Sequence, residues 1–257
     1  MSSKRDMERL ANVACMAHKY NFITTEAWAL QALLACLHTK TSPSIRNRVL
    51  IRITEAAILT GDEQIFAVAR RKWKGSIMEG NDLGATISAM ERLGIHDLSG
   101  LAYHALLLKG REHWEQELFL NREQRIRLLS GYHNLTQICD AFADTPPEIQ
   151  HLPSCTDNEE CNEMWDELWR LINSLDPAYG IGMQALKHHK LDILGRSRMA
   201  VSVMNAVVSG NFPGTGDYGR TRELVHEFVC SQPALSATLA FNAQLQTGML
   251  NFFPDVK

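Results

Sequence analysis

Long apolar runs and catalytic signatures are both missing from this sequence. No stretch approaches the ~20 apolar residues that span a bilayer, and the opening MSSKRDMERL is not followed by the apolar segment of a signal peptide. No Gly-x-Ser-x-Gly elbow and no Gly-Lys-Ser or Gly-Lys-Thr phosphate loop occurs. These absences predict an intracellular protein, cytoplasmic or nuclear, with no membrane partner, and they argue against serine hydrolases and P-loop nucleotide-binding proteins.

An excess of charge of one sign is missing as well. The chain carries 26 basic and 29 acidic side chains, which gives a formal net charge of -3. Such a balance produces no overall field that attracts nucleic acid or anionic lipid. The longest basic cluster, residues 70–74, is interrupted by Trp73 and is typical of the solvated face of a helix. We therefore expect no nucleic-acid partner.

Strand-like alternation is absent, whereas apolar residues recur at helical spacing along nearly the whole chain. Gly61 is placed to end one helix, and Pro146 with Pro147 to stop a longer one. Short loops between consecutive amphipathic helices make neighbouring helices antiparallel. The sequence therefore predicts an all-α protein, an antiparallel helical stack with a Cys/His-containing connector and a smaller C-terminal helical part. The stack, the connector and the C-terminal part are predicted to cover residues 1–145, 146–163 and 164–257.

Two tryptophans of the predicted stack lie on the apolar stripes of their helices. Trp28 shares its stripe with Ala32, and Trp73 shares its stripe with Ala69 and Ile77. Residues three or four positions apart lie on one helix face, so both tryptophans are predicted to anchor the core. Beyond the connector, helices are predicted at about 162–174, 181–190, 197–209, 219–230 and 233–246.

Cysteines are few, at six in 257 residues, and their spacing shows no disulfide framework. Cys15, Cys36 and Cys139 lie in helical patterns among apolar neighbours. In a reducing compartment such thiols behave as small core residues. We expect these three to be structural.

The densest group of chemically active side chains is in HLPSCTDNEECNEMW, residues 151–165. It places His151, Cys155 and Cys161 after the proline pair, and thiolate and imidazole are the preferred ligands of zinc. Because the prolines stop one helix and Trp165 restarts a buried face, the chain between them must cross the surface as a connection between two helical subdomains. We expect this connection to bring the three side chains close together.

Three interpretations of these side chains remain open. A structural zinc normally has four protein ligands, and the gaps of three and five residues between the candidates do not match a Cys-x-x-Cys knuckle. Spacing does not identify the fourth ligand, for which the candidates are His133, His188 and His189. A disulfide between Cys155 and Cys161 and a pair of free thiols in a polar loop are the other two interpretations.

No residue is predicted to be catalytic. His188 and His189 are adjacent, so on a helix their side chains diverge by about 100°. No nucleophile motif accompanies either histidine. Apart from a structural zinc on His151, Cys155 and Cys161, no cofactor is predicted.

Several segments, taken in chain order, resemble one protein family. They are LANVACMAHKYNFITTEAWALQAL (10–33), LAYHALLLKGREHW (101–114), LNREQRIRLLSGYHNLTQICDAF (120–142), the proline pair (146–147), and the spaced His, Cys, Cys and Trp that follow. Their order and spacing resemble the large basidiomycete group of BTB/POZ-domain proteins over roughly residues 7–200. The first segment is similar to the helix pair that follows a BTB core, and six residues precede Met7. The chain therefore resembles the helical, BACK-like region of these fungal proteins without the BTB core.

The resemblance implies a non-catalytic, all-helical protein-protein interaction module with an unidentified protein partner. It fixes neither that partner nor the oligomeric state. The alternative that the residues themselves raise is a zinc-stabilised regulator or a metal-dependent enzyme using His151, Cys155 and Cys161.

Overall fold

The computed structural model describes residues 4–38, 45, 47–173, 190–211 and 224–254. Within these residues every regular element is an α-helix or a short 3-10 helix, and none is a strand, so the all-α prediction is confirmed. No helix of this part is both long and apolar enough to cross a bilayer. The chain divides into two compact units, Met1–Arg122 and Glu123–Lys257.

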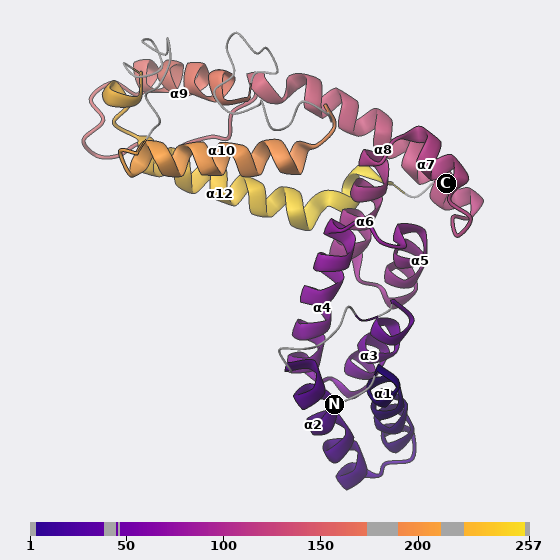
Figure 1. Ribbon diagram of the computed structural model, residues 1–257. Helices are drawn as coiled ribbons and strands as arrows, with labels where there is room; N and C mark the ends of the chain where they lie inside the picture. The colour runs from indigo at the N-terminus through magenta and orange to yellow at the C-terminus, as the bar shows by residue number, and fades with distance from the viewer. Residues whose placement is uncertain (1–3, 39–44, 46, 174–189, 212–223, 255–257) are drawn as a thin grey trace. The chain divides into compact units, whose positions relative to one another are not determined.

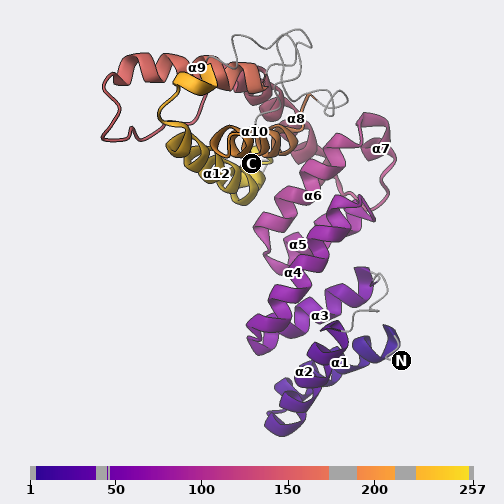
Figure 2. The same cartoon turned by 60° about the vertical axis from the view of Figure 1, so that its left-hand side comes forward.

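The first unit is a stack of α-helices (Figures 1 and 2). Its helices are α1 (Lys4–Lys19), α2 (Ile23–His38), α3 (Asn47–Thr60), α4 (Glu63–Met78), α5 (Leu83–Leu93), α6 (His96–Leu108) and α7 (Arg111–Gln116). α1 packs on α2 and α3, α3 packs on α4, and α5 packs on α6. Asn21, with a φ of +58°, turns the chain between α1 and α2.

Local signals explain the ends of α3 and α4. Gly61 has a φ of +71°, the left-handed conformation that glycine adopts freely after a helix. Asp62 then caps α4, because its carboxylate accepts a hydrogen bond of 2.9 Å from the backbone N–H of Ile65. The predicted stop at Gly61 is therefore confirmed.

The two predicted tryptophan anchors of the first unit behave differently. Trp73 is fully buried, and its indole N–H donates a 3.0 Å hydrogen bond to the hydroxyl of Thr54, as predicted for a core residue. Trp28 is 59% exposed, so the prediction that it anchors the core is wrong. The buried stripe of α2 is Ala29, Leu33 and Leu37. Trp28 is the residue before this stripe, and a step of one residue turns a side chain by about 100° around the helix.

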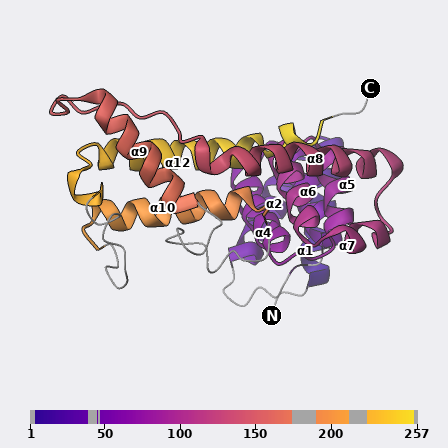
Figure 3. The ribbon, with the colours of Figure 1, turned by 90° about the horizontal axis from the view of Figure 1, so that it is seen from above.

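Among its described residues, the second unit contains one long helix, three further α-helices and a short helical stretch at 224–227 around an aromatic core. Its elements are α8 (Arg122–Ala141), η1 (Phe142–Asp144), α9 (Asn158–Asn173), α10 (Ile193–Val208), α12 (Ser231–Gly248) and η3 (Met249–Phe252). α10 and α12 run side by side, and α9 contacts α10 and η1 (Figures 1 and 3).

The helices predicted beyond the connector are present where the structure describes them. α9, α10 and α12 correspond to the predictions at 162–174, 197–209 and 233–246. The helix predicted at 181–190 lies outside the described residues except for its last position, a turn, and that predicted at 219–230 is described only from 224, with helix at 224–227. The compact units divide at the first residue of α8, whereas the sequence pattern places its first boundary after 145. The predicted three-part division stays a prediction.

Two buried tryptophans of α9 hold the chain that leaves α8. The indole N–H of Trp169 donates to the carbonyl of Phe142, and that of Trp165 donates to the carbonyl of Pro147, both at 2.8 Å. Trp165 also stacks on Phe228, with ring centroids 5.9 Å apart. The start of the connector is thereby fixed to α9 before it reaches His151.

A buried arginine of α10 packs against the same aromatic core. The guanidinium of Arg196 donates to the carbonyls of Cys139 and Asn173, at 2.6 and 3.1 Å, and its carbon lies 4.6 Å from the centroid of the Phe142 ring. Burial lowers the pKa of Arg196 from its usual value. Cys139 is buried, as predicted, whereas Cys15 and Cys36 are half-buried.

Candidate metal centre

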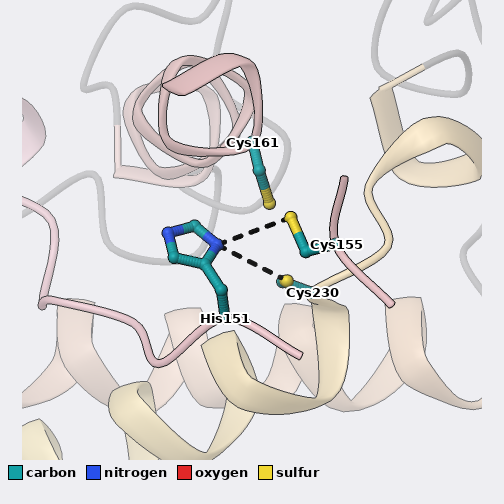
Figure 4. A group of neighbouring side chains, drawn as sticks. All are labelled: His151, Cys155, Cys161 and Cys230. Carbon is teal, nitrogen blue, oxygen red and sulfur yellow. Dashed lines mark hydrogen bonds between the residues drawn. The ribbon is translucent and has the colours of Figure 1, made fainter. Parts of the chain in front are cut away.

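The structure brings four side chains of the second unit together, and we refer to them as the Cys3His cluster. They are His151, Cys155, Cys161 and Cys230, and their ligand atoms all lie within 4.8 Å of one another. Figure 4 shows the imidazole and the three sulfur atoms pointing toward a common centre. The predicted proximity of the first three side chains is confirmed, and Cys230 joins them from the N-terminal end of α12.

Two spacings of the cluster match edges of a tetrahedral zinc site. Nδ1 of His151 is 3.7 Å from the sulfur of Cys155 and 3.7 Å from the sulfur of Cys230. Zinc bonds of about 2.3 Å to sulfur and about 2.0–2.1 Å to nitrogen, at tetrahedral angles, place sulfur and nitrogen about 3.6 Å apart. These two distances therefore fit a single ion bound by His151, Cys155 and Cys230.

A turn in the connector places Cys155 next to His151. Pro153 lies inside this turn, which is closed by a 2.9 Å hydrogen bond from the N–H of Cys155 to the carbonyl of Leu152. The N–H of Leu152 in turn points at the sulfur of Cys230, at 3.5 Å. The connector therefore brings two of the four side chains together and directs one backbone N–H at a third.

The capping of α9 places Cys161. The carboxylate of Asp157 accepts hydrogen bonds of 3.0 Å from the backbone N–H groups of Glu159 and Glu160, which begins the helix. Cys161 then lies in the first turn, with its N–H bonded to the carbonyl of Asp157 at 3.2 Å. The Asp157 carboxylate beside the cluster therefore caps the N-terminus of α9.

The Cys161 thiol lies buried beside two other thiols. Cys161 and Cys230 are buried, and His151 and Cys155 are half-buried. Burial first, and then the neighbouring Cys230 and Cys155 thiols, raise the pKa of the Cys161 thiol to about 12. Adjacent thiolates repel one another, so a metal-free site of this kind favours protonated thiols. A divalent cation binds the deprotonated sulfurs and thereby favours the thiolates.

The ligand set selects a soft or borderline metal. Thiolate and imidazole suit zinc, whereas calcium and magnesium require oxygen ligands. Three sulfurs and one nitrogen correspond to a Cys3His set, which binds structural zinc with four protein ligands. All six cysteines are free thiols in the structure, Cys155 and Cys161 included.

Sequence reasoning did not find Cys230, which lies 79 residues beyond His151. Of the residues considered for the fourth position, His133 is outside the cluster and lies on α8, with Nε2 3.1 Å from the amide nitrogen of Gln137. His188 and His189 lie outside the described residues. The one available signal was that Cys230 is the sixth cysteine, at the end of the predicted helix 219–230 and not among the three thiols expected to be structural.

No protein-family model, no curated protein and no solved structure matches this chain. The inference about the Cys3His cluster therefore rests on its ligand types, their separations and their burial.

Proposed function

We propose that this chain is a non-catalytic protein-protein interaction module whose second unit is fastened by a structural zinc ion. The observation that carries this proposal is the four-ligand composition of the Cys3His cluster. Catalytic zinc keeps one coordination position open for water or substrate, whereas structural zinc is enclosed by four protein ligands. A closed site supports a structural role for the metal.

One ion in the Cys3His cluster would join three separate segments of the second unit. His151 and Cys155 belong to the connector, Cys161 to the first turn of α9, and Cys230 to the end of α12. Between Pro153 and Glu160 every side chain is exposed except the half-buried Cys155, so apolar burial contributes little to holding this part of the connector. Structural zinc supplies apparent folding free energy on the order of 10 kcal/mol, which suits such a segment.

The interaction role is supported by two observations. The sequence resembles the helical region that follows the BTB core in basidiomycete proteins. In addition, the α1 and α2 hairpin exposes Met16, Tyr20, Phe22, Ile23 and Trp28, each by more than half of its surface. Large exposed apolar side chains gathered on one helical hairpin are typical of interaction sites.

Cobalt substitution tests the structural role of the metal directly. Co²⁺ bound to three thiolates and one imidazole in a closed tetrahedron gives intense visible absorption bands and strong sulfur-to-metal charge-transfer bands. We expect these bands to be unchanged when azide is added, because no coordination position is open. A spectrum that shifts with azide would show an exchangeable ligand, and would favour a metal-dependent enzyme over the proposed module.

A further inference from the structure

Cys155 is the most accessible thiol of the Cys3His cluster. Cys161 and Cys230 are 2% and 0% exposed, whereas Cys155 is half-buried. Residues 156–160, which connect Cys155 to Cys161, all have exposed side chains. A dissolved oxidant therefore reaches the sulfur of Cys155 more easily than it reaches either buried sulfur.

We infer that the Cys3His cluster is an oxidation-sensitive switch, in which hydrogen peroxide joins Cys155 to one of the two buried thiols and zinc is released. The inference rests on the proposed function, because it concerns the regulation of the same metal site. Cysteine binds zinc as the thiolate, and the thiolate is also the form that peroxides oxidise. Metal binding thus supplies three sulfurs in the reactive form, and exposure selects Cys155 among them.

The reaction consumes two thiolates and one molecule of hydrogen peroxide. The Cys155 thiolate attacks one peroxide oxygen, so that an S–O bond forms, the O–O bond breaks and hydroxide leaves. The thiolate of Cys161 or Cys230 then attacks the sulfur of this sulfenic acid, so that the S–S bond forms, the S–O bond breaks and a second hydroxide leaves. Solvent protons convert both hydroxides to water. The two sulfurs are oxidised to a disulfide and supply the two electrons that reduce the peroxide.

Both buried sulfurs lie close enough to Cys155 for this reaction. The ligand atoms of the cluster are all within 4.8 Å of one another (Figure 4). A disulfide joins two sulfurs at about 2.05 Å, so a shift of under about 3 Å brings Cys155 to bonding distance from either thiol. The exposed side chains of residues 156–160 leave the connector free of buried apolar contacts that would oppose such a shift.

The disulfide removes two of the four ligands of the proposed zinc ion. One thiolate and His151 then remain, whereas structural zinc is held by four protein ligands. A disulfide from Cys155 to Cys161 ties the connector to α9 and leaves α12 without its metal link, and one from Cys155 to Cys230 does the reverse. Oxidation thus separates one of the three segments that the ion joins.

Peroxide treatment of the purified zinc-loaded chain tests the switch. We expect a zinc-sensitive dye to report loss of the bound zinc, together with the loss of two thiols per chain. Peptide mapping under non-reducing conditions should place Cys155 in the new disulfide. Dithiothreitol followed by added zinc should restore both the thiols and the bound metal, because a disulfide is reversible.

Cys155→His removes the accessible thiol but keeps a metal ligand, because imidazole also binds zinc and forms no disulfide. We expect this variant to release zinc about tenfold more slowly than the wild type under the same peroxide concentration, because its remaining cluster thiols are buried. Cys36→Ser is the matched control, since Cys36 is a half-buried thiol outside the cluster, and it should release zinc at the wild-type rate.

Zinc that stays bound in the wild type under peroxide would overturn the inference. A disulfide that excludes Cys155, or a zinc loss that dithiothreitol and added zinc do not reverse, would overturn it as well. These wild-type measurements decide the inference even where Cys155→His does not hold zinc. Zinc content measured before peroxide is added reports on the proposed function, so failure of the zinc-stabilised module and failure of the switch are distinguishable.

Discussion

The sulfur of Cys230 lies 3.7 Å from Nδ1 of His151, although 79 residues separate the two in the chain. Cys230 occupies the N-cap position of α12, and His151 belongs to the connector that follows α8. This contact converts a local pair of thiols and an imidazole into a set of four ligands. The assignment of a structural metal depends on it, because three protein ligands leave a coordination position open.

Cys230→Ser is expected to abolish stoichiometric zinc binding. Serine retains the size of the side chain but supplies a hydroxyl, which is a poor zinc ligand at neutral pH. Removal of one ligand should also lower the melting temperature, because the metal contributes to folding free energy. The matched control is Cys36→Ser, since Cys36 is a half-buried cysteine of the first unit and lies outside the cluster. Equal zinc content in the two variants would contradict the assignment.

Zinc affinity is expected to fall as the pH is lowered. Zinc binds the thiolate, and the Cys161 thiol, with its pKa raised to about 12, holds its proton at neutral pH in the metal-free protein. Binding must therefore release at least this proton, so the dissociation constant should rise at least tenfold for each unit by which the pH falls below neutral. Calorimetry in buffers of different ionisation enthalpy measures the protons released. An affinity that does not depend on pH would show that no thiol is deprotonated on binding.

Arg196→Met is expected to destabilise the second unit by about 2–4 kcal/mol. Methionine keeps an apolar stem against Phe142 but leaves the buried carbonyls of Cys139 and Asn173 without the donors that Arg196 gives them. Urea unfolding measures the change. Arg198→Met serves as the control, because Arg198 is exposed on the same helix and should change stability by less than about 0.5 kcal/mol.

The same glycine-to-alanine substitution is expected to have opposite effects on two helices. At Gly131 in α8 an added methyl group would overlap the ring of Phe253, so the ring must move, at a cost of about 1–3 kcal/mol. At Gly75 in α4 the added methyl group meets nothing within 4 Å. Gly75→Ala should therefore stabilise by about 0.5–1 kcal/mol through helix propensity alone. Denaturant unfolding of both variants gives the two signs, and a stabilising Gly131→Ala would show that Phe253 does not pack there.

Much of the fold follows from local sequence signals. Gly61 ends α3, Asp62 begins α4, and the positions of α9, α10 and α12 agree with the helical periodicity of their segments. These features depend on residues a few positions apart, which the sequence displays directly.

The buried face of a helix and the contacts between residues far apart in the chain could not be predicted from local sequence signals. Trp28 lies on one of two apolar faces of α2, and periodicity does not tell which of these faces α1 and α4 cover. Cys230 approaches His151 only through the packing of the second unit. The three candidate ligands near each other in the chain were predicted, and the fourth candidate required the tertiary structure.

The central claim is that the Cys3His cluster holds a structural zinc ion, and elemental analysis combined with a chelator melt tests it most directly. We expect close to one zinc per chain after extensive dialysis, and a large fall in melting temperature when a strong chelator removes it. The connector, the start of α9 and the start of α12 should lose protection from hydrogen exchange together, because one ion joins them. A protein that contains no zinc and melts at the same temperature with and without chelator would contradict the account, and would leave the four side chains as a cluster of free thiols around a histidine.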